Sequence, residues 1–335
     1  MTAVYGFATS HSPMLSTAPE YWVERTEEDR KNKALLYRGT SYDFPGVVAA
    51  RQGEDFEKAA SAEGMQLSYK ACQEAIATLA TRFEEAQVDR AIIIGNDHKE
   101  SFSDECFAAV TVFAGGSIWQ VPFTAETIPL MVPGTERARE GHTPPQPVSH
   151  PGDPALADGL IAWLNDAEFD VARSTILPPG KYSNRSIPHA FGFPYRRVMR
   201  DRVVPNVPVF INTFYPPNIM KVSRCIRLGT EIGRYVAGLD DGKNTAVLAS
   251  GGLSHFVVEA DLDRFVLDAM AAKDLDALGS LDEAVLESGT AEIRSWIVMG
   301  AAMIELGLEM EVVDYVPAYR SEAGTGVGMG FVTWK

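Results

Sequence analysis

Arg90-Ala-Ile-Ile-Ile-Gly-Asn-Asp-His98 is the stretch of sequence that decides the fold. Its three consecutive isoleucines favour a strand that is buried on both faces, as in the centre of an α/β sheet, and Gly95 marks the end of that strand. The polar residues Asn96, Asp97 and His98 follow directly. Because open α/β sheets bind ligands beyond the carboxyl ends of their strands, we expect this cluster to line a site.

Four further apolar runs are short and bounded by turn-forming residues, as is typical of strands; they cover residues 3–9, 109–113, 207–213 and 245–249. Apolar residues at helical spacing alternate with these runs, and they cover residues 65–83, 156–164, 222–232, 262–278 and 291–306. The alternation predicts an α/β protein whose central mixed or mainly parallel sheet is flanked by helices. We expect one large three-layer domain over residues 1–335.

Residues 16–60 show no sustained hydrophobic period. A long irregular insertion in a compact protein is more often a lid or a binding segment than a linker, so we expect this one to cover the site. The glycine-rich tail Gly324–Gly330 is predicted to be a loop that approaches another element closely. Only Phe331–Lys335 follow it, so no helix could complete a nucleotide-binding motif.

Charge and composition limit the partners of the protein. The 335 residues carry a formal net charge of −15, which disfavours nucleic acids and anionic membranes as partners. No apolar run approaches the roughly 18 to 20 residues of a membrane span, and no secretory signal is recognisable. Three widely spaced cysteines without a C-x-x-C pair fit free thiols in a reducing compartment. We therefore expect a cytoplasmic protein that binds a small molecule.

Six histidines could carry chemistry, and three of them share one placement. His11, His98 and His255 each follow the predicted end of a strand in turn-forming sequence. Because a parallel sheet gathers such ends at one edge, we expect these three histidines to share a polar site. A single histidine is more often structural, but the common placement favours a site. The other three are His142, His150 and His189.

Two imidazoles and one carboxylate form the facial arrangement that binds Fe(II) with open coordination positions. Glu292 is one candidate carboxylate, at the start of the helix predicted over residues 291–306. An acidic residue there also complements the helix dipole, worth about 0.3 to 1 kcal/mol, and spacing alone favours this structural explanation. Asp97, beside His98, is a rival ligand on the same grounds.

Taken together, five motifs resemble the class III extradiol ring-cleaving dioxygenases, above all the catalytic β subunit of protocatechuate 4,5-dioxygenase and the gallate and 3-O-methylgallate dioxygenases. The motifs are Gly6-Phe-Ala-Thr-Ser-His-Ser-Pro13, Gly95-Asn-Asp-His98, Asn212-Thr-Phe-Tyr-Pro-Pro217, Ser250-Gly-Gly-Leu-Ser-His255 and Glu292-Ile-Arg-Ser-Trp296. The resemblance implies a single catalytic domain with one non-haem Fe(II). It also implies a reaction that opens the ring of a catecholic acid of the gallate, 3-O-methylgallate or protocatechuate type with O2.

The same resemblance implies roles for individual residues. The iron ligands would be His11, His98 and Glu292. The acid/base histidine would be His255, on its Gly-Gly turn, and a further catalytic histidine, in a His-Pro context, would be His150.

Two residues are expected to contact the substrate. In gallate-type members a hydroxyl residue follows the first iron histidine, so the resemblance implies that Ser12 binds substrate. His189, within Ile187–Pro194, could orient a ligand or the aromatic ring, with a structural role as the alternative. The expected partners are the aromatic substrate, O2 and a second copy of the chain in a homodimer.

Other functions compete with this one. A zinc-type metallohydrolase could use the same imidazoles and Glu292, because zinc also accepts two histidines and a carboxylate. A non-catalytic interaction protein could share the fold, although the four matched residues His11, His98, His255 and Glu292 weigh against a loss of chemistry. A serine hydrolase is disfavoured, because the sequence has no G-x-S-x-G motif.

Overall fold

Four parallel strands form the centre of the protein in the computed structural model, which describes residues 3–335. In spatial order they are β1 (Val4–Thr9), β10 (Thr245–Ser250), β4 (Arg90–Gly95) and β9 (Asn206–Ile211). All six residues of β4 are buried, as its run of isoleucines predicted. The carboxyl ends of these strands therefore lie at one edge of the sheet.

The complete sheet has eight strands in the order β11-β12-β1-β10-β4-β9-β5-β8. The β12 strand pairs antiparallel with both β1 and β11, and β5 pairs antiparallel with β9 and parallel with β8. The sheet is thus mixed with a parallel centre, which confirms the predicted class. The outer strands are β11 (Met310–Tyr319), β12 (Gly326–Trp334), β5 (Val110–Phe113) and β8 (Ala172–Ser174).

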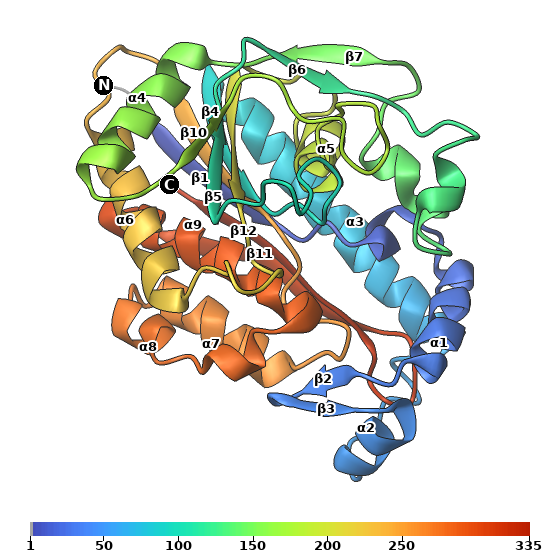
Figure 1. The fold of residues 1–335 in the computed structure, drawn as a ribbon. Helices are drawn as coiled ribbons and strands as arrows, with labels where there is room; N and C mark the ends of the chain where they lie inside the picture. Colours follow the sequence, from blue (N-terminus) through green and yellow to red (C-terminus); the bar gives the residue numbers. More distant parts are fainter. Residues whose placement is uncertain (1–2) are drawn as a thin grey trace.

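Helices cover both faces of the sheet, as Figure 1 shows. Side chains alternate along each strand, so Ile92 and Ile94 pack in one hydrophobic cluster with the helices α4, α6, α7 and α9, whereas Ile93 packs in the other with α3 and α5. This arrangement confirms three layers. The helices are α1 (Trp22–Lys31), α2 (Phe44–Ala50), α3 (Ala62–Glu85), α4 (Pro154–Asp166), α5 (His189–Phe193), α6 (Val222–Ala237), α7 (Ala260–Ala271), α8 (Leu275–Gly279) and α9 (Ile293–Glu305).

The glycine-rich tail is a buried strand, so the prediction of a loop at Gly324–Gly330 was wrong for most of the segment. The expected close approach of another element does occur. A Cβ atom on Gly330 would lie 2.9 Å from side-chain atoms of Leu253 and Trp296, and one on Gly328 would collide with Asp263. Glycine is required in this strand because the neighbouring elements leave no room for a side chain.

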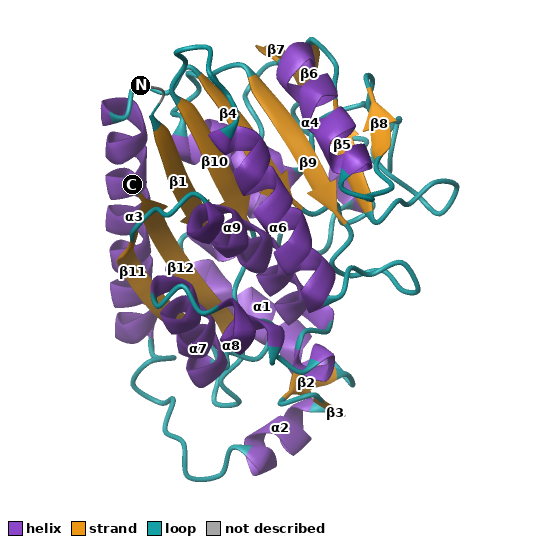
Figure 2. Cartoon of the chain, turned by 90° about the vertical axis from the view of Figure 1, so that its left-hand side faces the viewer, coloured by secondary structure: helices purple, strands orange, loops and turns teal. Residues whose placement is uncertain are grey.

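The segment 16–60 folds into short elements beyond the carboxyl ends of the central strands (Figure 2). It contains α1, the hairpin of β2 (Leu35–Tyr37) and β3 (Thr40–Tyr42), and α2. A second small ribbon pairs β6 (Ser117–Gln120) with β7 (Val148–Pro151). Within residues 3–335, none of the helices combines the length and the apolar composition that crossing a membrane requires.

Candidate active site

Three of the predicted site residues follow the carboxyl ends of the central parallel strands. His11 follows β1, His98 follows β4 and His255 follows β10. Glu292 comes from the other direction, at the amino end of α9, which packs against β10 and β4. The structure thus brings together at one sheet edge residues that lie as far apart as positions 11 and 292 in the sequence.

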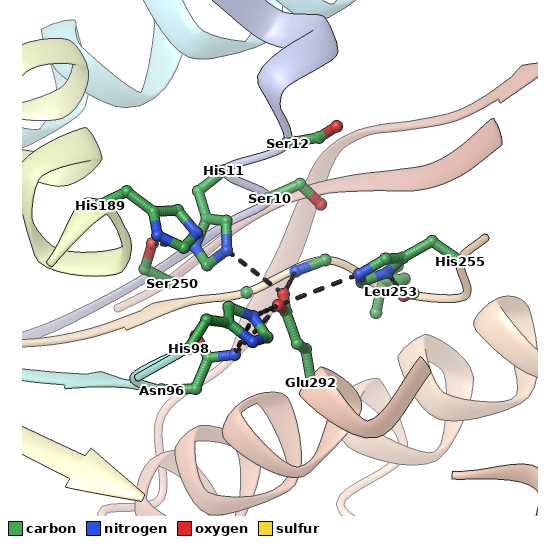
Figure 3. Close-up of polar contacts among 12 residues, drawn as sticks. Ser10, His11, Ser12, Asn96, His98, His189, Ser250, Leu253, His255 and Glu292 are labelled. Atoms are coloured by element: carbon green, nitrogen blue, oxygen red, sulfur yellow. Dashed lines mark hydrogen bonds and ion pairs between the residues drawn. The ribbon is translucent and has the colours of Figure 1, made fainter. Parts of the chain in front are cut away.

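The carboxylate of Glu292 is the point on which these side chains converge (Figure 3). Its Oε1 lies 2.7 Å from Nε2 of His98 and 3.9 Å from Nε2 of His255. Its Oε2 lies 3.3 Å from Nε2 of His11 and accepts a 2.6 Å hydrogen bond from the backbone N–H of Gly252. We call His11, His98, His255 and Glu292 the inner wall of the site.

Two glycines fix the place of the His255 ring. A Cβ atom on Gly252 would lie 2.6 Å from Cε1 of this ring, and one on Gly289 would collide with Cδ2 on its other edge. Glycine at both positions lets the backbone approach the imidazole closely. The Gly-Gly turn after β10 is therefore shaped around His255 and the carboxylate of Glu292.

The charges in the cluster suit metal binding. Burial alone would raise the pKa of Glu292. The electrostatic effect of His11 and the hydrogen bonds of His11 and His98 outweigh burial and hold the pKa well below its usual value. Burial lowers the pKa of His11 and keeps the imidazole neutral, although Glu292 acts in the opposite direction. An ionised carboxylate beside a neutral imidazole is the protonation state that a metal ion requires of its ligands.

Asp97 does not compete with His98 for this position. Its carboxylate accepts hydrogen bonds from three backbone N–H groups, those of Glu100 at 2.9 Å, Ser101 at 3.1 Å and Phe102 at 2.7 Å. Asp97 therefore closes the turn after β4, and the turn delivers His98 to Glu292. Burial and the charge of Glu100 together raise the pKa of Asp97 to about 6, against the opposing effect of the three hydrogen bonds.

A buried network supports His255 from behind. Nδ1 of His255 lies 2.7 Å from the carbonyl oxygen of Leu253, so this nitrogen is the donor and Nε2 is the nitrogen that faces Glu292. The preceding Ser254 donates its backbone N–H and its hydroxyl to Asp263, each over 2.7 Å. Tyr315 donates a third 2.7 Å hydrogen bond to the same carboxylate. The turn that carries His255 is therefore fixed by contacts within the core.

His189 covers the inner wall from the α5 side. Its ring lies 4.7 Å from the ring of His11, edge to face, and 5.7 Å from that of His98, in a stacked orientation. Its Nδ1 hydrogen-bonds to the carboxylate of Glu100. Burial would lower the pKa of His189, but Glu100 raises it to about 9. His189 thus lies next to two of the predicted ligands.

Glu100 and His142 also line the cavity, although the sequence did not predict them as site residues. Glu100 stands two residues after His98, so the polar run at this strand end was its only signal. The ring of His142 lies 5.8 Å from that of His189, and burial lowers the pKa of His142 to about 3. His142 follows a short helical turn in a connecting segment, and no local pattern distinguishes it from a surface residue.

His150 lies apart from the inner wall. Its Nε2 lies 2.8 Å from Oε1 of Gln120, its ring packs 4.9 Å from that of Tyr195, and it does not line the cavity. The amide of Gln120 in turn donates a 2.7 Å hydrogen bond to the carbonyl oxygen of His142. His150 therefore lies outside the cavity and is separated from it by Gln120 and His142. This position gives no support to the catalytic role predicted for His150.

A cavity of about 450 Å³ opens in front of the inner wall, a size typical of small-molecule sites. Ser12 lines it and also accepts a 3.3 Å hydrogen bond from the backbone N–H of Met14. The cavity is also lined by Tyr21, by Trp22 and Arg25 of α1, and by residues of the segment 123–142; we call α1 with Tyr21 and this segment the outer wall. Half of the side chains around the cavity are apolar or aromatic without counting the histidines, among them Tyr21, Trp22, Phe123, Met131, Phe193 and Phe214.

The donor set of the inner wall fits a metal ion of the two-histidine, one-carboxylate type. Nδ1 of His11 lies 3.0 Å from the hydroxyl of Ser250, which leaves Nε2 to bind a metal. Oδ1 of Asn96, whose amide group contacts both His98 and Glu292, is a buried oxygen without a hydrogen-bond partner in the described chain. Across residues 3–335, no three His, Cys, Asp or Glu side chains have the spacing of a formed metal site, and the imidazoles here contact the carboxylate directly.

Comparison with known proteins gives two matches. Residues 59–330 match the profile of the catalytic LigB subunit of aromatic ring-opening dioxygenase. In addition, 189 residues are 25% identical to the 2,3-dihydroxyphenylpropionate/2,3-dihydroxicinnamic acid 1,2-dioxygenase of Comamonas testosteroni. This second match covers 55% of the chain and 49% of the relative, so the chain spans about half the length of the curated relative that it matches.

Proposed function

Because the chain belongs to the family of the catalytic LigB subunit of aromatic ring-opening dioxygenases, we propose that it is an Fe(II)-dependent extradiol dioxygenase. Its substrate would be a catecholic aromatic acid, of the gallate, 3-O-methylgallate or protocatechuate type, whose ring it opens with O2. The observation that carries the proposal is the convergence of the Nε2 atoms of His11, His98 and His255 on the carboxylate of Glu292. This cluster faces a cavity with aromatic walls.

In this proposal His11, His98 and Glu292 hold the iron, which supplies the electronic coupling between catechol and O2. The protein must position the ring and move protons. Phe214, whose ring lies 5.7 Å from that of His98, is placed to pack against the aromatic ring of the substrate at the inner wall. Ser12 lines the same space and is proposed to bind a polar substituent of the substrate.

His255 is proposed to take a proton from the catechol and to return it later. Its Nδ1–H is committed to the carbonyl oxygen of Leu253, so its Nε2 is free to accept a proton on the cavity side. Burial lowers the pKa of His255, against the opposing effect of Glu292, so the imidazole is neutral and can act as a base near neutral pH. His189, which Glu100 holds over the rings of His11 and His98, is proposed to orient the ligands and the substrate.

The segment 16–60 is proposed to cover the bound ring. Five of its residues line the cavity, namely Ser16, Thr17, Tyr21, Trp22 and Arg25. The bidentate pair of Arg137 with Glu24, at 3.0 and 2.9 Å, joins α1 to the segment 123–142. These contacts keep the two parts of the outer wall together over the cavity.

An oxygen electrode tests the proposal. The protein is reconstituted anaerobically with Fe(II) or with Zn(II) and then offered gallate, 3-O-methylgallate, protocatechuate and 2,3-dihydroxyphenylpropionate with O2. We expect O2 uptake only with Fe(II), and a product heavier than the substrate by both oxygen atoms. No uptake with any catechol would refute the proposal. Hydrolysis that depends on Zn(II) would favour the metallohydrolase, and failure to bind either metal would favour a non-catalytic protein.

A further inference from the structure

We propose that Arg25 of the outer wall binds the carboxylate of the aromatic acid, and that this contact selects anionic catechols over neutral ones. The inference rests on the proposed function and assigns the second end of the substrate. The inner wall would hold the ring hydroxyls, and Arg25 would hold the acid group.

Arg25 is the cation best placed for this role among the lysines and arginines that line the cavity, which are Arg25, Lys181 and Arg320. Arg320 is buried and already neutralised by Asp29, to which it donates hydrogen bonds of 2.7 and 2.9 Å. Lys181 is exposed, so water screens its charge. Arg25 is partly buried, and within residues 3–335 it forms no ion pair with a carboxylate.

The acidic groups near Arg25 do not take up its charge. Asp29 is engaged by Arg320, and Glu28 pairs with Lys31 at 2.8 Å. Glu136 acts on Arg25 electrostatically but does not reach ion-pair distance in the described structure. A partly desolvated guanidinium without a paired carboxylate is stabilised when an anion enters the cavity.

The side chain of Arg25 is held in place by the segment opposite. Its Nη1 donates a 2.9 Å hydrogen bond to the carbonyl oxygen of Pro133. Gly134 leaves room for the stem, because a Cβ atom on this glycine would lie 3.3 Å from Cδ of Arg25. The described structure assigns no acceptor to Nε and Nη2 of Arg25, and these two donors have the fork geometry that matches a carboxylate.

The location of Arg25 also separates acid recognition from the chemistry. No hydrogen bond or ion pair of the described residues joins Arg25 to His11, His98 or Glu292, and Arg25 lies on α1, beyond the carboxyl ends of the central strands (Figure 2). It precedes the residues 59–330 that match the family profile. The guanidinium proposed to bind the acid therefore comes from a part of the chain outside that match, whereas Pro133 and Gly134, which hold it, lie inside the match.

Anaerobic equilibrium binding tests the inference without turnover. The ligands are 2,3-dihydroxyphenylpropionate and protocatechuate, which carry the carboxylate on a side chain or on the ring, and the methyl ester of each. We expect Arg25→Gln to weaken binding of at least one acid by about 10- to 100-fold, as loss of a charge-assisted hydrogen-bond pair predicts. Binding of its ester should change less than about two-fold, and Arg25→Lys should recover part of the loss, because it keeps the charge.

Arg137→Gln is the matched control, because Arg137 belongs to the same wall but is already paired with Glu24. It should leave the preference for acid over ester unchanged, and circular dichroism should show native folding for all variants. Equal losses for acid and ester in Arg25→Gln, no loss for either acid, or no binding of either acid to the wild type would overturn the inference. In steady-state assays the effect should appear in KM and leave kcat nearly unchanged. If the protein binds the acids selectively but consumes no O2, the proposed dioxygenase activity is refuted and the proposed anion site stands.

Discussion

The two walls of the cavity are built in different ways. The inner wall consists of side chains at the ends of buried strands and at the start of α9, each fixed by core contacts such as those of Asp263 behind His255. The outer wall consists of α1 and a connecting segment, joined by exposed contacts such as the pair of Arg137 with Glu24. Rigid elements hold reactive groups precisely, whereas connecting segments vary without loss of the fold.

This difference predicts a division of labour. Changes in the inner wall should abolish or slow the reaction with every substrate, because all substrates meet the same ligands there. Changes in the outer wall should alter which substrate binds and leave the chemistry intact. The experiments below test this contrast, beginning with the largest expected effect.

Glu292→Ala should abolish iron retention and, with it, O2 uptake. The substitution removes the carboxylate on which His11 and His98 converge, and two imidazoles alone bind Fe(II) weakly. Iron content after gel filtration should fall from about one per chain to near zero, since a ligand and its charge are lost. Glu287→Ala is the control, because Glu287 is exposed five positions earlier in the sequence. Unchanged iron content in Glu292→Ala would contradict the assignment.

His255→Ala should keep iron and substrate binding but lower kcat by about 10² to 10⁴, the usual contribution of a general acid/base. His150→Ala removes the same side chain from a position outside the cavity and should have a much smaller effect on kcat. Iron content and anaerobic substrate binding should be measured alongside turnover. If kcat of His150→Ala is lower than kcat of His255→Ala, His150 and not His255 is the acid/base residue, and the inner wall has been assigned wrongly.

Asp263→Asn should change how stability depends on pH. Burial raises the pKa of Asp263 to about 6, above its usual 3.8, so the folded state binds this proton more tightly than the unfolded state. The resulting stabilisation is fully present below about pH 4 and is lost as pH rises through about 6, which amounts to ~3 kcal/mol at most.

Urea unfolding at pH 4.5 and pH 7 measures this effect. The free energy of unfolding of Asp263→Asn should fall less between the two pH values than that of the wild type. Asp261→Asn serves as the control, because the Asp261 side chain lies on the same helix and is 92% exposed. Identical pH dependence in both variants would show that Asp263 does not carry the excess proton.

Glu24→Gln should have the smallest effect. The substitution breaks the ion pair between Glu24, whose side chain is 46% exposed, and Arg137, whose side chain is 41% exposed. Such surface pairs contribute about 0 to 1 kcal/mol to stability. The melting temperature should change little, and kcat should be unaffected. A loss of kcat comparable to that of His255→Ala would mean that closure of the outer wall takes part in the chemistry, and the contrast between the walls would fail.

Much of the inner wall could be predicted from local sequence. The isoleucine run of β4, its alternation between the two hydrophobic clusters and the polar residues after it all agree with the structure. The gathering of His11, His98 and His255 follows from strand polarity alone, since parallel neighbours end at the same edge. Whether Asp97 or His98 faces the site did not follow, because this depends on which backbone N–H groups the carboxylate of Asp97 reaches.

The C-terminal strands and the outer wall could not be predicted in the same way. The glycines of β12 have low strand propensity, and they are needed only because Leu253, Asp263 and Trp296 press against the strand. His142 lies in the proline-rich segment between β6 and β7, whereas His150 lies in β7 itself, and both residues contact Gln120. Segments without a hydrophobic period take their shape from such long-range contacts.

The sequence by itself determined the α/β class, the central strands and the edge at which the histidines meet, because hydrophobic period and strand direction are properties of local sequence. The resemblance implied that Glu292 joins these histidines, but only the tertiary structure showed that its carboxylate contacts them, that His150 lies outside the cavity, and that Arg25 lines the cavity without an ion pair. Each of these facts depends on packing between segments far apart in the chain, and no local pattern encodes such packing.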